Sequence, residues 1–404
     1  MEINKFLLYG IIVFSSIGNV FAQNPPVIDD AEKPLPKGKC GLGFFAEKVR
    51  QKETVSIALL GGSITQGSGA SQVSNSYWWL INGTLGKALK EKGSKLRLLH
   101  CAVGGTGSDY GAYRVGVQAL DKGVDLLVVE FAVNDSGSAE NVKNTDPAKS
   151  AVASMEGIVR QALKSNPRMG IIFLYTTTKG SVEKYYLNDA VMPSVLKHHE
   201  VALRYNIAEV HSGPVIAGKF KAGEFTLEKF FKDGVHPSDT GHALYAKLLS
   251  DAVIQSLDQN APEKIPAMPE PIIQNNVFST GRILPLKPLP NNGWTEEKPG
   301  YYTYAGCWSS KIAGSEMVIE ADGYDLKGLL IVKTTDLEYS GEGAAPAVFS
   351  VNGRPDSIPV MYFFPASKEP VVGKLKIKLQ APKNNKEAFS SIAGLLVSKK
   401  DKNE

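Results

Sequence analysis

Cysteine is scarce in this chain, which contains three such residues among 404. This small, odd number allows at most one internal disulfide, so a small fold held together by disulfides is excluded. The spacing of Cys40, Cys101 and Cys307 matches no metal site, and nothing in the sequence supports a bridge between Cys40 and Cys307. Cys101 lies in an apolar run, so we expect it to be a small buried residue.

Basic runs interleaved with aromatic residues are also missing, and the formal net charge is only +4. Nucleic acid is therefore not an expected partner. The glycine-rich stretch 104–108 does not have the G-x-G-x-x-G spacing of a dinucleotide site, and no Gly-Lys-Ser/Thr indicates a phosphate loop, so we expect no cofactor. His198 and His199 are adjacent and would point about 100° apart on a helix, so we expect no bound metal there.

One long apolar run lies at the N-terminus. Lys5 precedes an apolar core at residues 6–14, and small residues suited to cleavage follow, up to Ala22. Polar residues interrupt the segment well short of the ~20 apolar residues of a membrane span. We therefore expect residues 1–22 to be a signal peptide and residues 23–50 an N-terminal extension. The mature protein is expected to be periplasmic or secreted, without stable membrane insertion, and its oligomeric state is left open.

Apolar strand-like runs alternate with helix-like stretches across residues 51–260. The strand-like runs lie at 55–60, 96–103, 125–133, 170–175 and, more weakly, 207–210, and the helix-like stretches at 78–91, 110–120, 147–164, 189–205 and 241–257. This alternation implies right-handed crossovers and a parallel sheet with helices on both faces. We predict a three-layer α/β/α sandwich with a parallel, flavodoxin-like sheet over residues 51–260.

The composition changes after this predicted domain. Residues 261–276 are rich in proline and poor in periodicity, which is typical of a linker. Short alternating runs separated by Gly, Pro, Asn and Asp then follow, at 315–321, 326–333, 347–351 and 374–379. We predict that residues 277–400 form a smaller all-β sandwich domain.

Polar or glycine positions follow three of the predicted strands and precede the last helix of the first domain. They are Ser63 after a Gly-Gly turn, Gly105 in a glycine-rich stretch, Asn134 after the third run, and the pair Asp233 and His236. Each alone also fits a turn or a helix cap. Together they have the elements of a serine nucleophile site, in which a carboxylate orients an imidazole and an amide donates to an oxyanion.

The order of these positions makes the sequence resemble the SGNH/GDSL hydrolase superfamily over roughly residues 50–257. That family carries catalytic Ser, Gly, Asn and His in four blocks, with an Asp three residues before the His. The resemblance implies that Ser63 is the nucleophile, His236 the general base and Asp233 its orienting partner.

The same resemblance implies an oxyanion hole made of the backbone N–H of Ser63, the backbone N–H of Gly105 and the side-chain amide of Asn134. The sequence also departs from the family pattern. Residues that differ are Gly62, Ala132 and His100, where the family usually has Asp, Gly and Asn.

We therefore expect an exported serine esterase that forms an acyl-enzyme on Ser63 and releases it with water activated by His236. Export and the attached β-domain favour removal of O-acetyl or other small ester groups from a polysaccharide. A lipid or small-ester acylhydrolase and a catalytically silent glycan-binding protein remain alternatives. Tyr77, Trp78 and Trp79 fit either a sugar-binding cleft or packed core.

Overall fold

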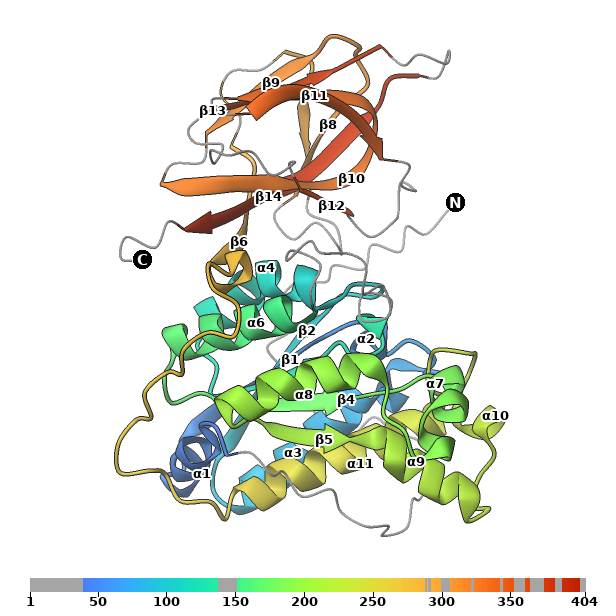
Figure 1. The fold of residues 1–404 in the computed structure, drawn as a ribbon. Coiled ribbons are helices and arrows are strands. Elements are labelled where there is room, and N and C mark those ends of the chain that lie inside the picture. Colours follow the sequence, from blue (N-terminus) through green and yellow to red (C-terminus); the bar gives the residue numbers. More distant parts are fainter. Residues whose placement is uncertain are drawn as a thin grey trace, which may run out of the picture. The chain divides into compact units, whose positions relative to one another are not determined.

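The computed structural model describes residues 39–136, 151–287, 289, 292–298, 306–320, 323–341, 344–351, 360–363, 374–381 and 387–399. The chain divides into two compact units (Figure 1). The first extends to Ser279, and the second begins at Thr280 and also includes Ala112–Val117. The expected signal peptide, residues 1–22, lies outside the described residues. Within the described ranges, no helix combines the length and the apolar character needed to cross a bilayer.

A five-stranded sheet forms the centre of the first unit, with the strand order β2-β1-β3-β4-β5. Its strands are β1 (Thr54–Gly61), β2 (Lys95–Ala102), β3 (Leu126–Glu130), β4 (Gly170–Tyr175) and β5 (Ala208–His211). Every neighbouring pair is parallel. β3 and β4 are buried along their whole length, as expected of strands covered on both faces.

Helices cover both faces of this sheet. The described helices of this part of the chain are α1 (Leu42–Arg50), α2 (Ser63–Gln66), α3 (Tyr77–Glu91), α4 (Ser108–Gln118, of which Ala112–Val117 group with the second unit), α6 (Ala151–Ser165), α7 (Lys179–Lys184), α8 (Pro193–Tyr205), α9 (Ser212–Lys221), α10 (Leu227–Phe230) and α11 (Asp239–Ser256). α3 packs against α11 on one face, and α6 packs against α8 on the other (Figure 1). The predicted three-layer α/β/α arrangement with a parallel sheet is confirmed.

Helix boundaries follow local chemistry that the periodicity alone did not reveal. The helix expected over 189–205 begins only at Pro193, because Asp189 has a left-handed φ of 55° and proline is favoured in the first helical turn. The same helix ends at Tyr205, because the next residue, Asn206, also takes the left-handed conformation. The third strand ends at Glu130 and not at residue 133, because residues 132–135 form a turn.

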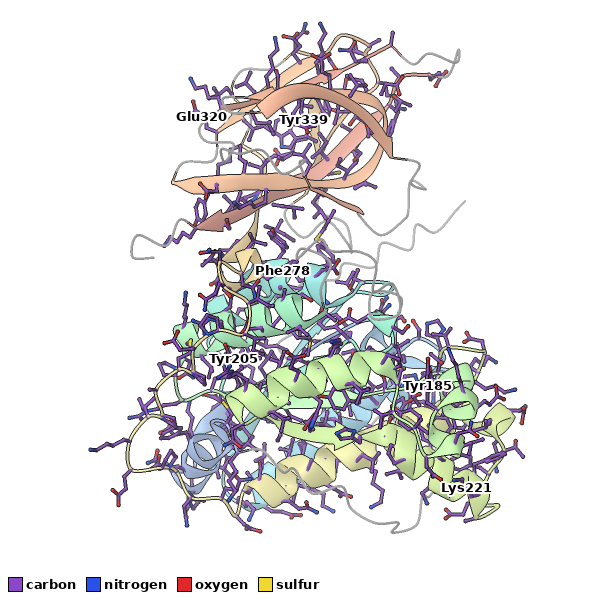
Figure 2. The ribbon with its side chains drawn as sticks, viewed as in Figure 1. Tyr185, Tyr205, Lys221, Phe278, Glu320 and Tyr339 are labelled. Carbon is purple, nitrogen blue, oxygen red and sulfur yellow. The ribbon has the colours of Figure 1, made fainter. Side chains whose placement is uncertain are left out.

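The stretch 261–276, which we expected to be a linker, is attached to α6. Pro269 O accepts a hydrogen bond from Arg160 at 2.9 Å, and Ile273 N donates to the buried Glu156 carboxylate at 3.0 Å. Phe278, which directly follows this stretch, is fully buried and leaves no space for a side chain at position 157 of α6 (Figure 2). These contacts hold the stretch on the first unit. The predicted domain boundaries themselves stay a prediction.

The second unit is an antiparallel β-domain, as predicted. Its strands are β6 (Gly281–Leu284), β7 (Thr295–Glu297), β8 (Cys307–Ser310), β9 (Glu316–Glu320), β10 (Tyr324–Gly341), β11 (Ala344–Val351), β12 (Val360–Phe363), β13 (Lys374–Leu379) and β14 (Ser390–Lys399). They connect in the order β7-β8-β14-β10-β13-β9, with β11 and β12 also paired to β10 and β6 to β14.

The long strand β10 pairs with different strands along its length. Its first part pairs with β14 as far as Thr334, and its end pairs with β13 from Leu337. Apolar side chains of β9, β13, β14 and both parts of β10 form one buried cluster, which includes Met317, Leu329, Tyr339, Ile377 and Leu395. The connected sheet therefore encloses a single core.

Candidate active site

Ser63 follows β1 after one residue, Gly62, and is the first residue of the short helix α2. β1 lies between β2 and β3, so Ser63 lies at the carboxyl end of a strand that is paired on both sides. The turn before Ser63 has no room for side chains: a Cβ on Gly61 would lie 2.1 Å from Thr65 Oγ1, and one on Gly62 would lie 2.2 Å from Asn134 Oδ1. This crowding gives a physical reason for glycine at position 62, where the sequence departs from the family pattern.

The side chains of Ser63, His236 and Asp233 form a continuous chain of hydrogen bonds. His236 Nε2 lies 3.0 Å from Ser63 Oγ, and His236 Nδ1 lies 2.9 Å from Asp233 Oδ2. An ionised carboxylate can only accept, so Nδ1 carries the proton and Nε2 is left free to accept the proton of the serine. The structure thus brings together the three residues that the sequence suggested as a triad, although Ser63 and His236 are 173 positions apart.

Asp233 is held in its charged form by its own loop. Its Oδ1 accepts hydrogen bonds from the backbone N–H of His236 and of Val235, both at 2.7 Å. The bond from the His236 backbone contributes most to lowering the pKa of Asp233 from 3.8 to about 2, and the imidazole adds to it. The side chain of Asp233 is 54% exposed and that of His236 is 28% exposed, so this pair is open to solvent.

The loop that carries His236 packs against the segment that follows α2. Gly69 has a φ of +95°, and a Cβ there would lie 2.1 Å from Pro237 O. Glycine at position 69 is therefore required both by its left-handed conformation and by the close approach of the two backbones. Lys232 N donates to His236 O at 2.8 Å, which closes the histidine loop from the other end.

The first turns of α11 fasten the same segment. Asp239 accepts hydrogen bonds from Ser71 N at 2.8 Å and from Asn75 Nδ2 at 2.9 Å. His242, which is fully buried, faces Ser68 O through Nε2 at 3.1 Å and accepts from Tyr77 N through Nδ1 at 3.3 Å. Burial lowers the pKa of His242 to about 4, so its imidazole is neutral near pH 7.

The glycine-rich turn that contains Gly105 and the side chain of Asn134 both approach the nucleophile turn. Gly105 is exposed, has a φ of +69° and follows β2. Its neighbour Gly104 donates its N–H to Gln66 Oε1 of α2 at 2.7 Å, so the glycine-rich turn is attached to the helix that begins with Ser63. The side chain of Asn134 reaches the nucleophile turn at Gly62.

A buried aspartate connects the two strand-end loops that carry Gly105 and Asn134. Asp135 accepts a hydrogen bond from Ser108 N at 2.9 Å, and its second oxygen lies 2.9 Å from His198 Nε2. Asp135 and His198 are both almost completely buried. This pairing accounts for His198 as part of the scaffold.

Sequence reasoning missed several residues that support the site. Glu130, Asp135 and His242 are buried polar groups to which the sequence analysis assigned no part in the site. The available signal was a charged or polar side chain at the end of an apolar run, as at Glu130, but that pattern is also typical of an ordinary strand end.

The aromatic residues of α3 divide between core and surface. Tyr77 is fully buried and donates to Thr65 Oγ1 at 2.7 Å, so it is packed core. Trp78 is half-buried and stacks on the exposed ring of His100, with centroids 4.5 Å apart. His100 in turn donates from Nε2 to Thr65 O at 2.9 Å.

Within the described ranges, no three His, Cys, Asp or Glu side chains are arranged to hold a metal ion. Cys40, Cys101 and Cys307 are all free thiols. Burial raises the pKa of Cys40 to about 11, so its thiol stays protonated and is a poor nucleophile near neutral pH.

Residues 59–244 match the model of the GDSL-like lipase/acylhydrolase family. No curated protein sequence matches the chain. Two solved structures of a two-domain esterase (CEX) active on acetylated mannans are similar to this chain. The TM-score is 0.71 for the structure co-crystallized with mannopentaose and 0.72 for the other. They are 20% identical to this chain, and the alignments cover 90% of it and 96% and 97% of the esterase chains.

The acetylxylan esterase Axe2 from Geobacillus stearothermophilus is similar over a shorter stretch, with 16% identity, a TM-score of 0.38, and coverage of 51% of this chain and 95% of that one. The match to the family model includes Ser63, Gly105, Asn134, Asp233 and His236. The segment that holds these residues is therefore similar to the GDSL-like lipase/acylhydrolase family.

Proposed function

We propose that this protein is a serine esterase that removes O-acetyl or other small ester groups from a polysaccharide. The observation that carries the proposal is the chain of hydrogen bonds from Asp233 through His236 to Ser63 at the carboxyl end of β1. The match of residues 59–244 to a family of lipases and acylhydrolases supports hydrolysis of carboxylic esters as the reaction class. No cofactor takes part in this mechanism.

In the acylation step, Ser63 Oγ attacks the carbonyl carbon of the ester while His236 Nε2 accepts its proton. Asp233 keeps the imidazole in the correct tautomer and stabilises the imidazolium that forms. The negative oxygen of the tetrahedral intermediate accepts hydrogen bonds from the N–H groups of Ser63 and Gly105 and from the Asn134 amide. Each such donor is typically worth a factor of about 10²–10³ in kcat.

His236 then donates its proton to the departing sugar oxygen, which leaves an acyl group on Ser63. A water molecule attacks this acyl-enzyme while His236 Nε2 takes one of its protons. Collapse of the second tetrahedral intermediate returns the proton to Ser63 Oγ and releases the carboxylic acid. Water and the ester are the only reactants.

Two observations support an acylated polysaccharide as the substrate. The fold of both domains is similar to that of the two-domain esterase active on acetylated mannans, with 90% of this chain covered. The triad is open to solvent, since the Asp233 side chain is 54% exposed, and an open triad suits an ester group attached to a bulky polymer. Export through a signal peptide remains a prediction, because residues 1–22 lie outside the described ranges.

The test is hydrolysis of 4-nitrophenyl acetate, butyrate and octanoate, and release of acetate from acetylated mannan and xylan, by wild type and Ser63→Ala. We expect wild type to prefer acetate and to deacetylate at least one polysaccharide. Loss of a triad serine lowers kcat by about 10⁶ in a comparable enzyme, so Ser63→Ala should be inactive. Preference for octanoate would favour a lipid acylhydrolase. Equal inactivity of both proteins on every ester would contradict the proposal and favour a silent glycan-binding protein.

A further inference from the structure

Glu130 is a buried carboxyl group directly beneath the nucleophile turn. It is the last residue of β3, is paired with Gly61 of β1, and is only 1% exposed. Burial raises its pKa. A buried carboxylate without hydrogen-bond partners is strongly unfavourable. The hydrogen bonds that Glu130 accepts therefore explain how it can be accommodated at this position.

Three donors converge on this carboxyl group. Thr65 Oγ1 lies 2.8 Å from one oxygen and Thr176 Oγ1 lies 2.6 Å from the other, and the backbone N–H of Gly62 also donates to it. Tyr77 donates to Thr65 Oγ1 at 2.7 Å, so the proton of Thr65 itself is directed to Glu130. These protons all point toward the carboxyl oxygens, an arrangement that matches the ionised form.

The donors lie on both sides of the nucleophile in the sequence. Gly62 immediately precedes Ser63, Thr65 follows it by two residues, and Thr176 directly follows β4. One carboxylate therefore connects the ends of β1, β3 and β4 and holds the turn at two points. The turn is also closely packed, since a Cβ on Gly61 would lie 2.1 Å from Thr65 Oγ1 and 2.9 Å from Glu130 O.

We propose that Glu130 is a positioning residue, whose carboxylate fixes the turn from Gly61 to Thr65 and thereby places the Oγ and N–H of Ser63. This inference rests on the proposed esterase function for its effect on rate. Glu130 acts through Gly62 and Thr65, so it supports the reaction without touching the substrate.

The expected effect of removing this support is on kcat. Displacement of a reacting group by about 1 Å can lower the rate about 10²-fold. Glu130→Gln keeps the size of the side chain but replaces one acceptor oxygen by an amide donor, so at least one donor loses its partner. We expect kcat to fall about 10- to 100-fold, with KM changed less than about threefold.

Thr65→Val is the second variant, because it removes one donor to Glu130 with little change in shape and keeps the proposal testable if Glu130→Gln does not fold. Ser256→Ala is the matched control: Ser256 is fully buried and donates to Val253 O at 2.6 Å near the end of α11. We expect both test variants to lower kcat, and the control to lower only the melting temperature. Activity of both test variants equal to that of the control would overturn the proposal.

Hydrogen exchange of the peptide that contains residues 61–65 gives a readout that does not depend on activity. If Glu130 holds the Gly62 N–H, this peptide should exchange faster in Glu130→Gln and Thr65→Val than in Ser256→Ala and wild type. Unchanged exchange would contradict the positioning role. A wild type that is inactive on every ester but shows the expected exchange pattern would contradict the proposed function alone.

Discussion

Replacing Asp233 by Asn is the most informative single change in the triad. The Asn Oδ1 can still accept from the backbone N–H groups of Val235 and His236, so the loop should keep its conformation. The other atom becomes an NH₂ group that donates toward His236 Nδ1, which then has to be unprotonated. The imidazole proton moves to Nε2, which lies 3.0 Å from Ser63 Oγ and can no longer accept its proton.

The expected loss of kcat depends on this tautomer change and on the solvent exposure of the Asp233 side chain. In a serine protease with a buried aspartate, the equivalent substitution lowers kcat about 10⁴-fold. Asp233 is 54% exposed, so water can compete with the new amide for His236 Nδ1 and restore the useful tautomer part of the time. We therefore expect a smaller loss in Asp233→Asn, about 10²- to 10³-fold in kcat.

The assay is kcat on 4-nitrophenyl acetate at pH 7.5, with thermal melting to verify the fold. Asp258→Asn is the control, since Asp258 is an exposed aspartate beyond the end of α11. It should match wild type in both measurements. A kcat for Asp233→Asn within about threefold of wild type would contradict the role of Asp233 in fixing the tautomer of His236, because the wrong tautomer could not support such a rate.

Three further predictions concern the residues around the triad. Asn134→Ala should lower kcat about 10²- to 10³-fold through the loss of an oxyanion donor, and an unchanged kcat would remove Asn134 from the site. Gly69→Ala should lower both kcat and the melting temperature, because its Cβ would lie 2.1 Å from Pro237 O. The control Gly86→Ala, with open space around it, should lower neither, and equal melting temperatures of these two variants would contradict the prediction. His242 has its pKa lowered from 6.5 to about 4 by burial, so between those values the unfolded chain binds a proton that the folded chain does not. The free energy of unfolding should therefore decrease by about 3 kcal/mol as pH falls from above 6.5 to about 4, and urea melts should show a shallower pH dependence in His242→Gln. Parallel pH dependences would contradict that assignment.

The parts of the fold that were predictable are those with a strong local signal. The apolar runs of β1, β3 and β4 identified the central strands because these strands are buried on both faces. The short helices α2, α7 and α10 have four to six residues, too few for a hydrophobic period to be recognised. Their positions depend on tertiary contacts such as the hydrogen bond of Gln66 to Gly104 N.

The second domain shows a different limit. The sequence predicted a strand over 326–333, but β10 continues to Gly341. The polar residues after Lys333 are typical of a turn, and only their pairing with β13 and β11 shows that they continue the strand. The candidate site was more predictable than this strand, because the carboxyl ends of parallel strands meet at one edge of the sheet. Glu130 was not, since its role depends on donors from three separate segments.

The most direct measurement is covalent labelling of the nucleophile, followed by peptide mass spectrometry. Wild type would be incubated with diisopropyl fluorophosphate, which reacts with activated serines, and esterase activity would be followed in parallel. We predict one adduct, on the peptide containing Ser63, formed at the rate at which activity disappears, and much slower labelling in His236→Ala. Esterase activity that survives in Ser63→Ala, or an adduct on another serine that accompanies the loss of activity, would contradict this prediction.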